Sequence, residues 1–102
     1  MAYRVKIAAP AERDLERAVA YIAEVLAAPS AAVSLLDEYE RVLDLLAGNP
    51  SLFGVDFDVS EAVGVQVRRC MVKGYEVFYL AGDERQVVPV VAFLHGPGTL
   101  RR

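Results

Sequence analysis

Hydrophobic residues dominate one continuous stretch, Val63 to Gly96, in which three apolar runs are separated by two polar breaks. Val, Tyr and Phe suit the packed surface of a β-sheet, and the breaks at Lys73-Gly74 and Ala81 to Arg85 have the composition of turns. The stretch therefore predicts three consecutive β-strands. In the second and third runs both the odd and the even positions are apolar, so these strands need cover on both faces.

Two details of this block give sharper expectations. Val63, Val65 and Val67 alternate with other residues, so the first strand is predicted to begin at Val63 with these three side chains on one face. Pro89 interrupts the third run. Because proline has no N–H to donate to a sheet, its strand is expected to lie at an edge or to carry a bulge.

The first 50 residues predict one strand followed by two helices. Alternation at Tyr3, Val5 and Ile7 indicates the strand, and Pro10 ends it. Residues 11–27 and 31–47 then each carry an apolar stripe at helical spacing. The stripes are Leu15, Ala18, Val19, Ile22, Val25 and Leu26, and Ala32, Leu35, Leu36, Tyr39, Val42, Leu43 and Leu46.

The signals around the second helix place its two ends. Ala28-Pro29-Ser30 turns the chain, with Ser30 as the expected N-cap, and Gly48-Asn49-Pro50 stops the helix. Two striped helices joined by so short a connection form an antiparallel αα-hairpin. Residues 51–62 mix apolar and loop-like residues, and we expect an ordered connection there, with a short strand as the alternative.

These elements combine into one predicted architecture. The class is α+β with the order β-α-α-β-β-β, in a single domain spanning residues 1–102. The helical hairpin is expected to cover one face of a small, mainly antiparallel sheet. Its joint apolar stripe supplies half of the cover that the strands require.

Composition and charge narrow the class of protein. A chain of 102 residues that is 55% hydrophobic, with mean hydropathy +0.30, is expected to fold around one modest core. No apolar run approaches the roughly 18 residues of a membrane span. No signal peptide is apparent and Cys70 is the single cysteine, which favours the cytoplasm and a core role for this thiol. The net charge of −3 lacks the basic excess of strong nucleic-acid binders.

Few residues suggest chemistry. One histidine, one cysteine and scattered carboxylates predict neither a metal site nor a cofactor, and no Gly-rich phosphate loop is present. Metal-free RNA cleavage would need a base, an acid and cations. The candidates are His95 or Glu76 as base, Tyr79 as acid, and Arg68, Arg69 and Lys73 as cations. Strand parity turns Glu76 and Tyr79 to opposite faces, and likewise separates Arg68 from Arg69.

The element order, together with several local phrases, resembles the RelE/ParE superfamily of bacterial toxins, and the ParE-like branch in particular. The resemblance implies a cytoplasmic toxin encoded beside an antitoxin, with an extended or helical antitoxin segment wrapped around the toxin. Proteins of the ParE type act on DNA gyrase, whereas those of the RelE type cut mRNA in the ribosomal A site. The matching phrases are Tyr3-Arg4-Val5, Ala11-Glu12-Arg13-Asp14-Leu15, Leu45-Leu46-Ala47-Gly48-Asn49-Pro50, Arg68-Arg69, Tyr75-Glu76-Val77-Phe78-Tyr79 and Leu94-His95-Gly96.

Two departures from the family pattern bear on activity. Glu76 stands where relatives commonly carry a basic residue, and Pro97-Gly98-Thr99 follows Leu-His-Gly where many continue with arginine and an acidic residue. Both departures remove positive charge from the side where the nucleases of this superfamily hold RNA. They speak against RNA cleavage.

Three hypotheses follow. The favoured one is a ParE-like toxin that acts by protein binding, with DNA gyrase as target and a cognate antitoxin as inhibitor. The partner-binding candidates are Arg68, Arg69, Lys73, Glu76 and Phe78. The second is a ribosome-dependent nuclease using His95, Arg68 and Arg69, which predicts loss of toxicity in His95→Ala. The third is an inactive relative that only binds its partner. A homodimer and a toxin–antitoxin hetero-oligomer are both compatible with the sequence.

Overall fold

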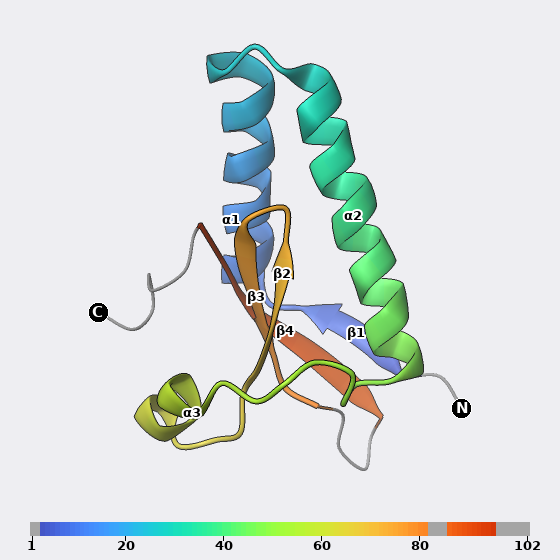
Figure 1. The fold of residues 1–102 in the computed structure, drawn as a ribbon, viewed down its shortest axis with the longest axis vertical. Coiled ribbons are helices and arrows are strands. Elements are labelled where there is room, and N and C mark those ends of the chain that lie inside the picture. The colour runs from blue at the N-terminus through green and yellow to red at the C-terminus, as the bar shows by residue number, and fades with distance from the viewer. Residues whose placement is uncertain (1–2, 82–85, 96–102) are drawn as a thin grey trace.

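A computed structural model describes residues 3–81 and 86–95, and Figure 1 shows the arrangement of their elements. The class is α+β and the predicted order β-α-α-β-β-β is present, with one further helix before the second strand. The elements are β1 (Arg4–Ile7), α1 (Ala9–Ala20), a π-helical turn η1 (Tyr21–Val25), α2 (Pro29–Gly48), α3 (Phe57–Val63), β2 (Arg68–Val72), β3 (Tyr75–Tyr79) and β4 (Val87–His95).

The sheet has the strand order β1-β4-β3-β2. β4 runs parallel to β1, and the other two pairs are antiparallel, as the prediction of a mainly antiparallel sheet requires. Lys73 and Gly74 join β2 to β3 with φ angles of 52° and 85°. Positive φ at both central residues is the geometry that matches the twist of a tight hairpin. The predicted turn at Ala81 to Arg85 lies mostly outside the described residues, and so does the tail after Gly96.

The αα-hairpin packs on one face of the sheet, as expected (Figure 1). Most residues of the predicted stripes supply its side of the core, whereas Val25 and Leu26 at the end of the first stripe are exposed. Each fully buried aliphatic or aromatic side chain contributes about 1.5–3 kcal/mol. From β3, every second residue faces this core: Tyr75, Val77 and Tyr79. The main core cluster joins Ala11, Leu15, Leu35, Tyr39, Val42 and Leu46 of the hairpin to Cys70, Val72, Val77, Tyr79, Val88, Val90 and Phe93 of the sheet.

The opposite face of the sheet is covered in part by α3. Val59 of α3 packs with Val67 and Phe78, and this smaller cluster extends along β4. Odd residues of β3 therefore face the hairpin, while even residues face α3. The apolar residues at both parities had predicted cover on both faces, and this expectation is confirmed.

Helix α3 corrects the prediction for residues 51–62, which expected a connection without a helix. Asp56 caps the helix by accepting a hydrogen bond from the Val59 amide at 3.0 Å. Gly64 ends it in the left-handed conformation, with φ of 82°. Since Val63 is the last residue of α3, the strand predicted to begin there starts instead at Arg68. The alternation of valines in this segment was misleading.

Two further details differ from the sequence prediction or refine it. Helix α2 begins at Pro29, so Ser30 lies inside the helix and is not its N-cap. Proline suits the first helical position because the N–H it lacks has no acceptor there. Pro89 lies in β4, which is an interior strand, so the edge alternative is wrong. The bulge alternative holds: Phe78 and Tyr79 pair with Ala92 and Val90, which leaves Val91 between them without a partner in the register.

The hairpin is longer than the sheet it covers, and its free end projects past the β2–β3 turn (Figure 1). We call residues 21–34 the hairpin tip. Glu24 is its single charged residue.

Candidate functional site

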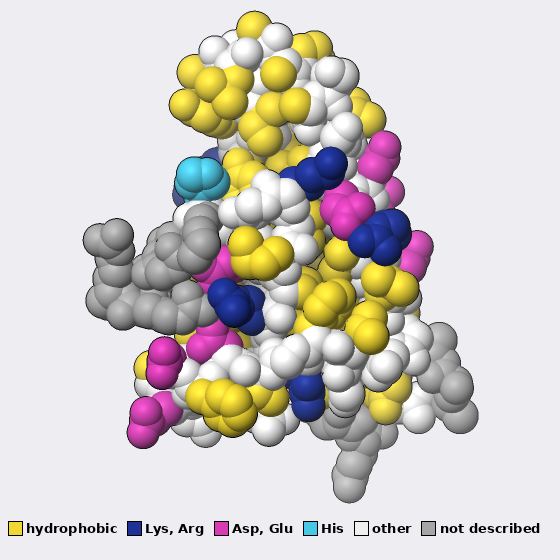
Figure 2. Space-filling view, in the orientation of Figure 1, with side chains coloured by type: hydrophobic (Ala, Val, Ile, Leu, Met, Phe, Trp, Pro, Cys, Tyr) yellow, Lys and Arg dark blue, Asp and Glu magenta, His cyan; other side chains and the backbone are white. Residues whose placement is uncertain are grey.

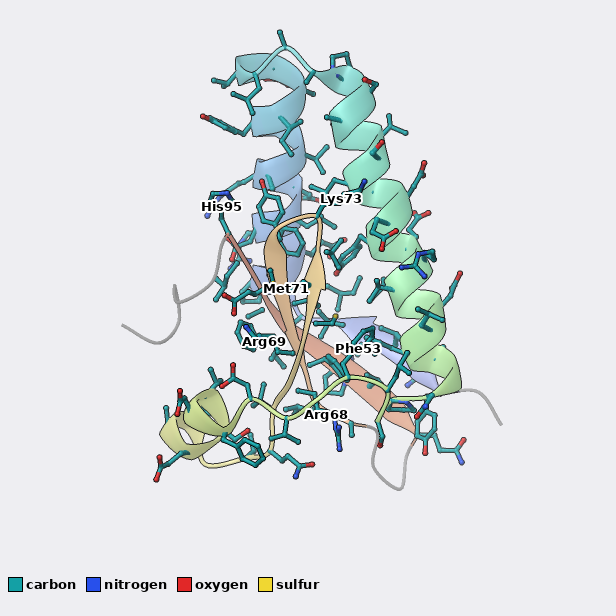
Figure 3. The ribbon with its side chains drawn as sticks, viewed as in Figure 1. Phe53, Arg68, Arg69, Met71, Lys73 and His95 are labelled. Atoms are coloured by element: carbon teal, nitrogen blue, oxygen red, sulfur yellow. The ribbon has the colours of Figure 1, made fainter. Side chains whose placement is uncertain are left out.

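The three residues proposed for catalysis do not converge. His95 lies opposite Tyr75 at one end of β3, and Arg68 lies opposite Tyr79 at the other end. Four strand positions correspond to about 14 Å along the sheet. In addition, β2 and β4 lie on opposite sides of β3. Figure 3 shows His95 and Arg68 at opposite ends of the sheet, so the structure does not bring these two candidates together.

Arg68 holds the connection that precedes α3. Its Nη1 donates a hydrogen bond of 2.6 Å to the carbonyl of Phe53 and a longer one of 3.5 Å to that of Ser51. The backbone is joined in the same place, since the Arg69 amide donates to the Gly54 carbonyl at 3.1 Å. The side chain of Arg68 therefore fixes this connection along the outer edge of β2 and is not simply solvated.

Arg69 lies on the opposite face, as strand parity predicted, between two buried carboxylates. Its Nε is 3.7 Å from Asp56 Oδ2, and its Nη1 is 3.7 Å from Glu76 Oε1. The side chains of Asp56 and Glu76 are only 5% and 1% exposed. Burying carboxylates without a counter-charge is costly, so Arg69 stabilises both. Arg69 therefore links the N-cap of α3 to β3.

Glu76 and Phe78, which were predicted to contact a partner, are buried within the described structure. They are 1% and 0% exposed. Phe78 is covered by the cluster that Val59 of α3 joins, and Glu76 lies against Arg69. The sequence prediction missed this because it missed α3. Lys73 is exposed in the β2–β3 turn and keeps its place as a predicted contact.

Tyr79 and Cys70 belong to the core between hairpin and sheet. Tyr79 is fully buried, and burial raises the pKa of its hydroxyl, so it does not serve as the predicted acid at the surface. Cys70 is 4% exposed, and burial raises the pKa of its thiol to about 11. It packs as the small hydrophobic residue that the sequence indicated.

An aromatic groove lies between α1 and the ends of β3 and β4, with a volume of about 500 Å³. The rings of Tyr75 and Phe93 stack with their centroids 4.9 Å apart, and His95 is 5.0 Å from Tyr75. Its other lining residues include Tyr21 and the exposed Asp14–Arg17 pair, whose charged atoms are 3.4 Å apart. The volume and mostly apolar lining are typical of sites that bind a ligand or an anchoring side chain.

The hairpin tip adds a second apolar surface. Tyr21, Val25, Leu26 and Val33 are between 53% and 67% exposed. Figure 2 shows hydrophobic side chains covering the free end of the hairpin, above His95 and the basic residue at the β2–β3 turn. Tyr21 belongs to both the tip and the aromatic groove, which makes them neighbours. Contiguous exposed apolar surface of this kind marks interaction sites in soluble proteins.

The described residues contain no cluster of three or more His, Cys, Asp or Glu side chains that could hold a metal ion. Within the same part of the chain, the helices are all too short or too polar to span a membrane. The surface features of the described residues include the aromatic groove, the hairpin tip, a crevice between the two long helices, and exposed apolar residues on and beside α3, of which Phe57 is 78% exposed.

Comparison with known proteins then identifies the family. A family model described as "ParE toxin of type II toxin-antitoxin system, parDE" matches residues 5–97. A search of curated proteins returned no match. Because the family match spans nearly the whole chain, this protein belongs to the ParE toxin family, and the resemblance stated from the sequence is confirmed. The family implies a type II toxin with a cognate antitoxin as partner.

Proposed function

We propose that this member of the ParE toxin family arrests growth in the cytoplasm by binding a cellular protein, with DNA gyrase as the favoured target. A cognate antitoxin neutralises it by covering its exposed apolar surface. The observation that carries the proposal is the separation of His95 from the two arginines, about 14 Å along the strands for Arg68 and about 10 Å for Arg69. Among the described residues these candidates do not assemble into a catalytic set, which favours action by binding.

The roles of the two arginines add support. Arg68 donates to the Phe53 carbonyl, and Arg69 is shared between Asp56 and Glu76. Both cations are therefore engaged inside the protein, whereas a nuclease needs cations directed at the phosphate whose charge grows in the transition state. Apolar surface remains accessible at the hairpin tip and in the aromatic groove. Such surfaces contribute to protein–protein affinity by burial of apolar area.

The proposal is tested by inducing the chain in a bacterial host, alone and together with the product of the adjacent antitoxin gene. We expect growth to stop in the first case and to continue in the second. A frameshifted gene induced to the same transcript level controls for the burden of expression. The purified protein is then added to a gyrase supercoiling assay, where inhibition is expected.

Transcript integrity separates the alternatives. We expect full-length mRNA in the arrested cells. Transcripts cut within their coding regions, together with normal gyrase activity, would instead assign the chain to the ribosome-dependent nucleases. Normal growth on induction of soluble protein would identify an inactive relative that retains only its partner-binding surface.

A further inference from the structure

We infer that the crevice between α1 and α2 is a docking groove for a basic amphipathic segment of the cognate antitoxin. This inference rests on the proposed function, because it states which kind of antitoxin segment binds the toxin and where. The groove has a volume of about 370 Å³ and lies between the two long helices, apart from the aromatic groove. We call it the interhelical groove. It is lined by Leu15, Glu16, Val19, Ala20, Ala23, Glu24 and Leu36.

The floor of the interhelical groove is apolar. Leu15, Val19 and Leu36 also contact the main core, so the floor is anchored to the packed interior. Ala20 is exposed and its side chain is small, which leaves room for a side chain from outside. An amphipathic helix docks on such a surface through apolar residues at i, i+3, i+4 and i+7 spacing.

The charged residues of this groove have one sign. Glu16 and Glu24 are its two charged lining residues, and both are exposed. Within the described residues neither forms an ion pair or a side-chain hydrogen bond. The surrounding hairpin, residues 9–48, carries three basic and eight acidic side chains, and so a net charge of −5. Complementary charge both directs association and suppresses wrong partners, so the occupant is basic.

The π-helical turn explains how two glutamates so far apart share one groove. In an unbroken α-helix, residues eight positions apart are turned about 80° away from each other. In η1 the chain winds more loosely, and the Leu26 amide bonds to the Tyr21 carbonyl, five residues back, at 3.0 Å. The looser winding reduces the offset between Glu16 and Glu24 and places both at the same groove. Single π-turns within α-helices are frequent at functional sites.

The test measures binding of the purified antitoxin, the product of the adjacent gene, to the full chain by calorimetry. In the double variant Glu16→Gln/Glu24→Gln we expect roughly 5- to 30-fold weaker binding, because two partly exposed charge pairs are lost. Raising the salt concentration should weaken the wild-type complex more than the variant complex. The variant Ala20→Phe fills the groove without changing the charge and should also weaken binding.

A matched control changes the same net charge elsewhere. Asp58→Asn/Glu61→Gln alters two exposed carboxylates on α3, which covers the opposite face of the sheet, and should leave the affinity within about twofold. Circular dichroism and urea unfolding check that each variant is folded. Overlapping peptides from the antitoxin provide the second readout. The tightest-binding peptide should carry at least two Lys or Arg residues beside an apolar stripe.

The outcomes separate the inference from the function on which it rests. Growth arrest that the antitoxin reverses, combined with unchanged affinity of the Glu16/Glu24 and Ala20 variants, overturns the groove assignment and leaves the proposed function intact. A tightest-binding peptide that is acidic or uncharged also overturns it. Absence of both arrest and antitoxin binding by the wild-type chain overturns both proposals.

Discussion

Arg69 and Asp56 show how a single pair of side chains joins two parts of this protein. Asp56 caps α3 through one oxygen, and its other oxygen is 3.7 Å from Arg69 on β2. Arg69 in turn reaches Glu76 on β3, at 3.7 Å. The sequence did not identify Asp56 as the partner of Arg69, because Asp56 lies 13 residues away in a segment whose helix was not recognised. Pairing across such a distance depends on the fold, which periodicity alone does not specify.

Asp56→Ala is expected to destabilise the protein by about 2–3 kcal/mol. The loss of an N-cap costs about 1 kcal/mol, and the remainder comes from leaving Arg69 beside a buried carboxylate without its second partner. Asp56→Asn keeps a capping oxygen and removes the charge, so its loss should be smaller. Urea unfolding of both variants measures the difference. Equal losses would show that the ion pair contributes most of the stabilisation and the cap little.

Elements with long, regular stripes were predictable, and short or irregular ones were not. The two long helices each repeat their apolar spacing over several turns, and that repeat is a direct consequence of packing on the sheet. α3 has one buried residue, Val59, and its signals are the local caps at Asp56 and Gly64. The π-turn η1 also escaped prediction, because an apolar stripe does not reveal where the helix widens. The aromatic groove also could not be predicted from periodicity, because its lining residues come from α1, β3 and β4, which are distant in sequence.

The β2–β3 turn offers a test at the scale of one element. Lys73→Asn should stabilise the protein by a few tenths of a kcal/mol, since Asn-Gly is the preferred pair for a turn with two positive φ angles. Gly74→Ala should destabilise it by about 1–2 kcal/mol, because a side chain at φ of 85° is strained. Nothing lies within 4 Å of a Cβ added there, so the cost is conformational. Thermal unfolding measures both, and a neutral Gly74→Ala would contradict the turn geometry.

The whole molecule is a sheet with unequal cover, and its main core contains groups that resist ionisation. Burial raises the pKa of Cys70 to about 11 and that of Tyr39 to about 12, and it also raises the pKa of Tyr79. All three belong to the cluster between hairpin and sheet. Ionising any of these three side chains within the folded protein would place a charge in the apolar core between the helical hairpin and the sheet.

Stability should therefore fall as the pH rises above about 9. The unfolded chain loses these protons at ordinary pKa values, whereas the folded protein keeps them to higher pH, so the unfolded state binds fewer protons in this range. Cys70 alone should account for a loss of about 1–3 kcal/mol between pH 9 and 11. Urea unfolding at a series of pH values tests this. Cys70→Ala should give a shallower decline over that interval, and an identical slope would rule out the thiol as a cause.

The place of β4 in the sheet has a consequence for synthesis. β4, the last strand of the described chain, lies between β3 and β1. β1 is synthesised first, but it can pair within the sheet only after β4 has been synthesised. Contacts between distant parts of a chain form late in folding. A chain released before β4 has been translated therefore carries an incomplete sheet, in which β1 lacks its neighbouring strand.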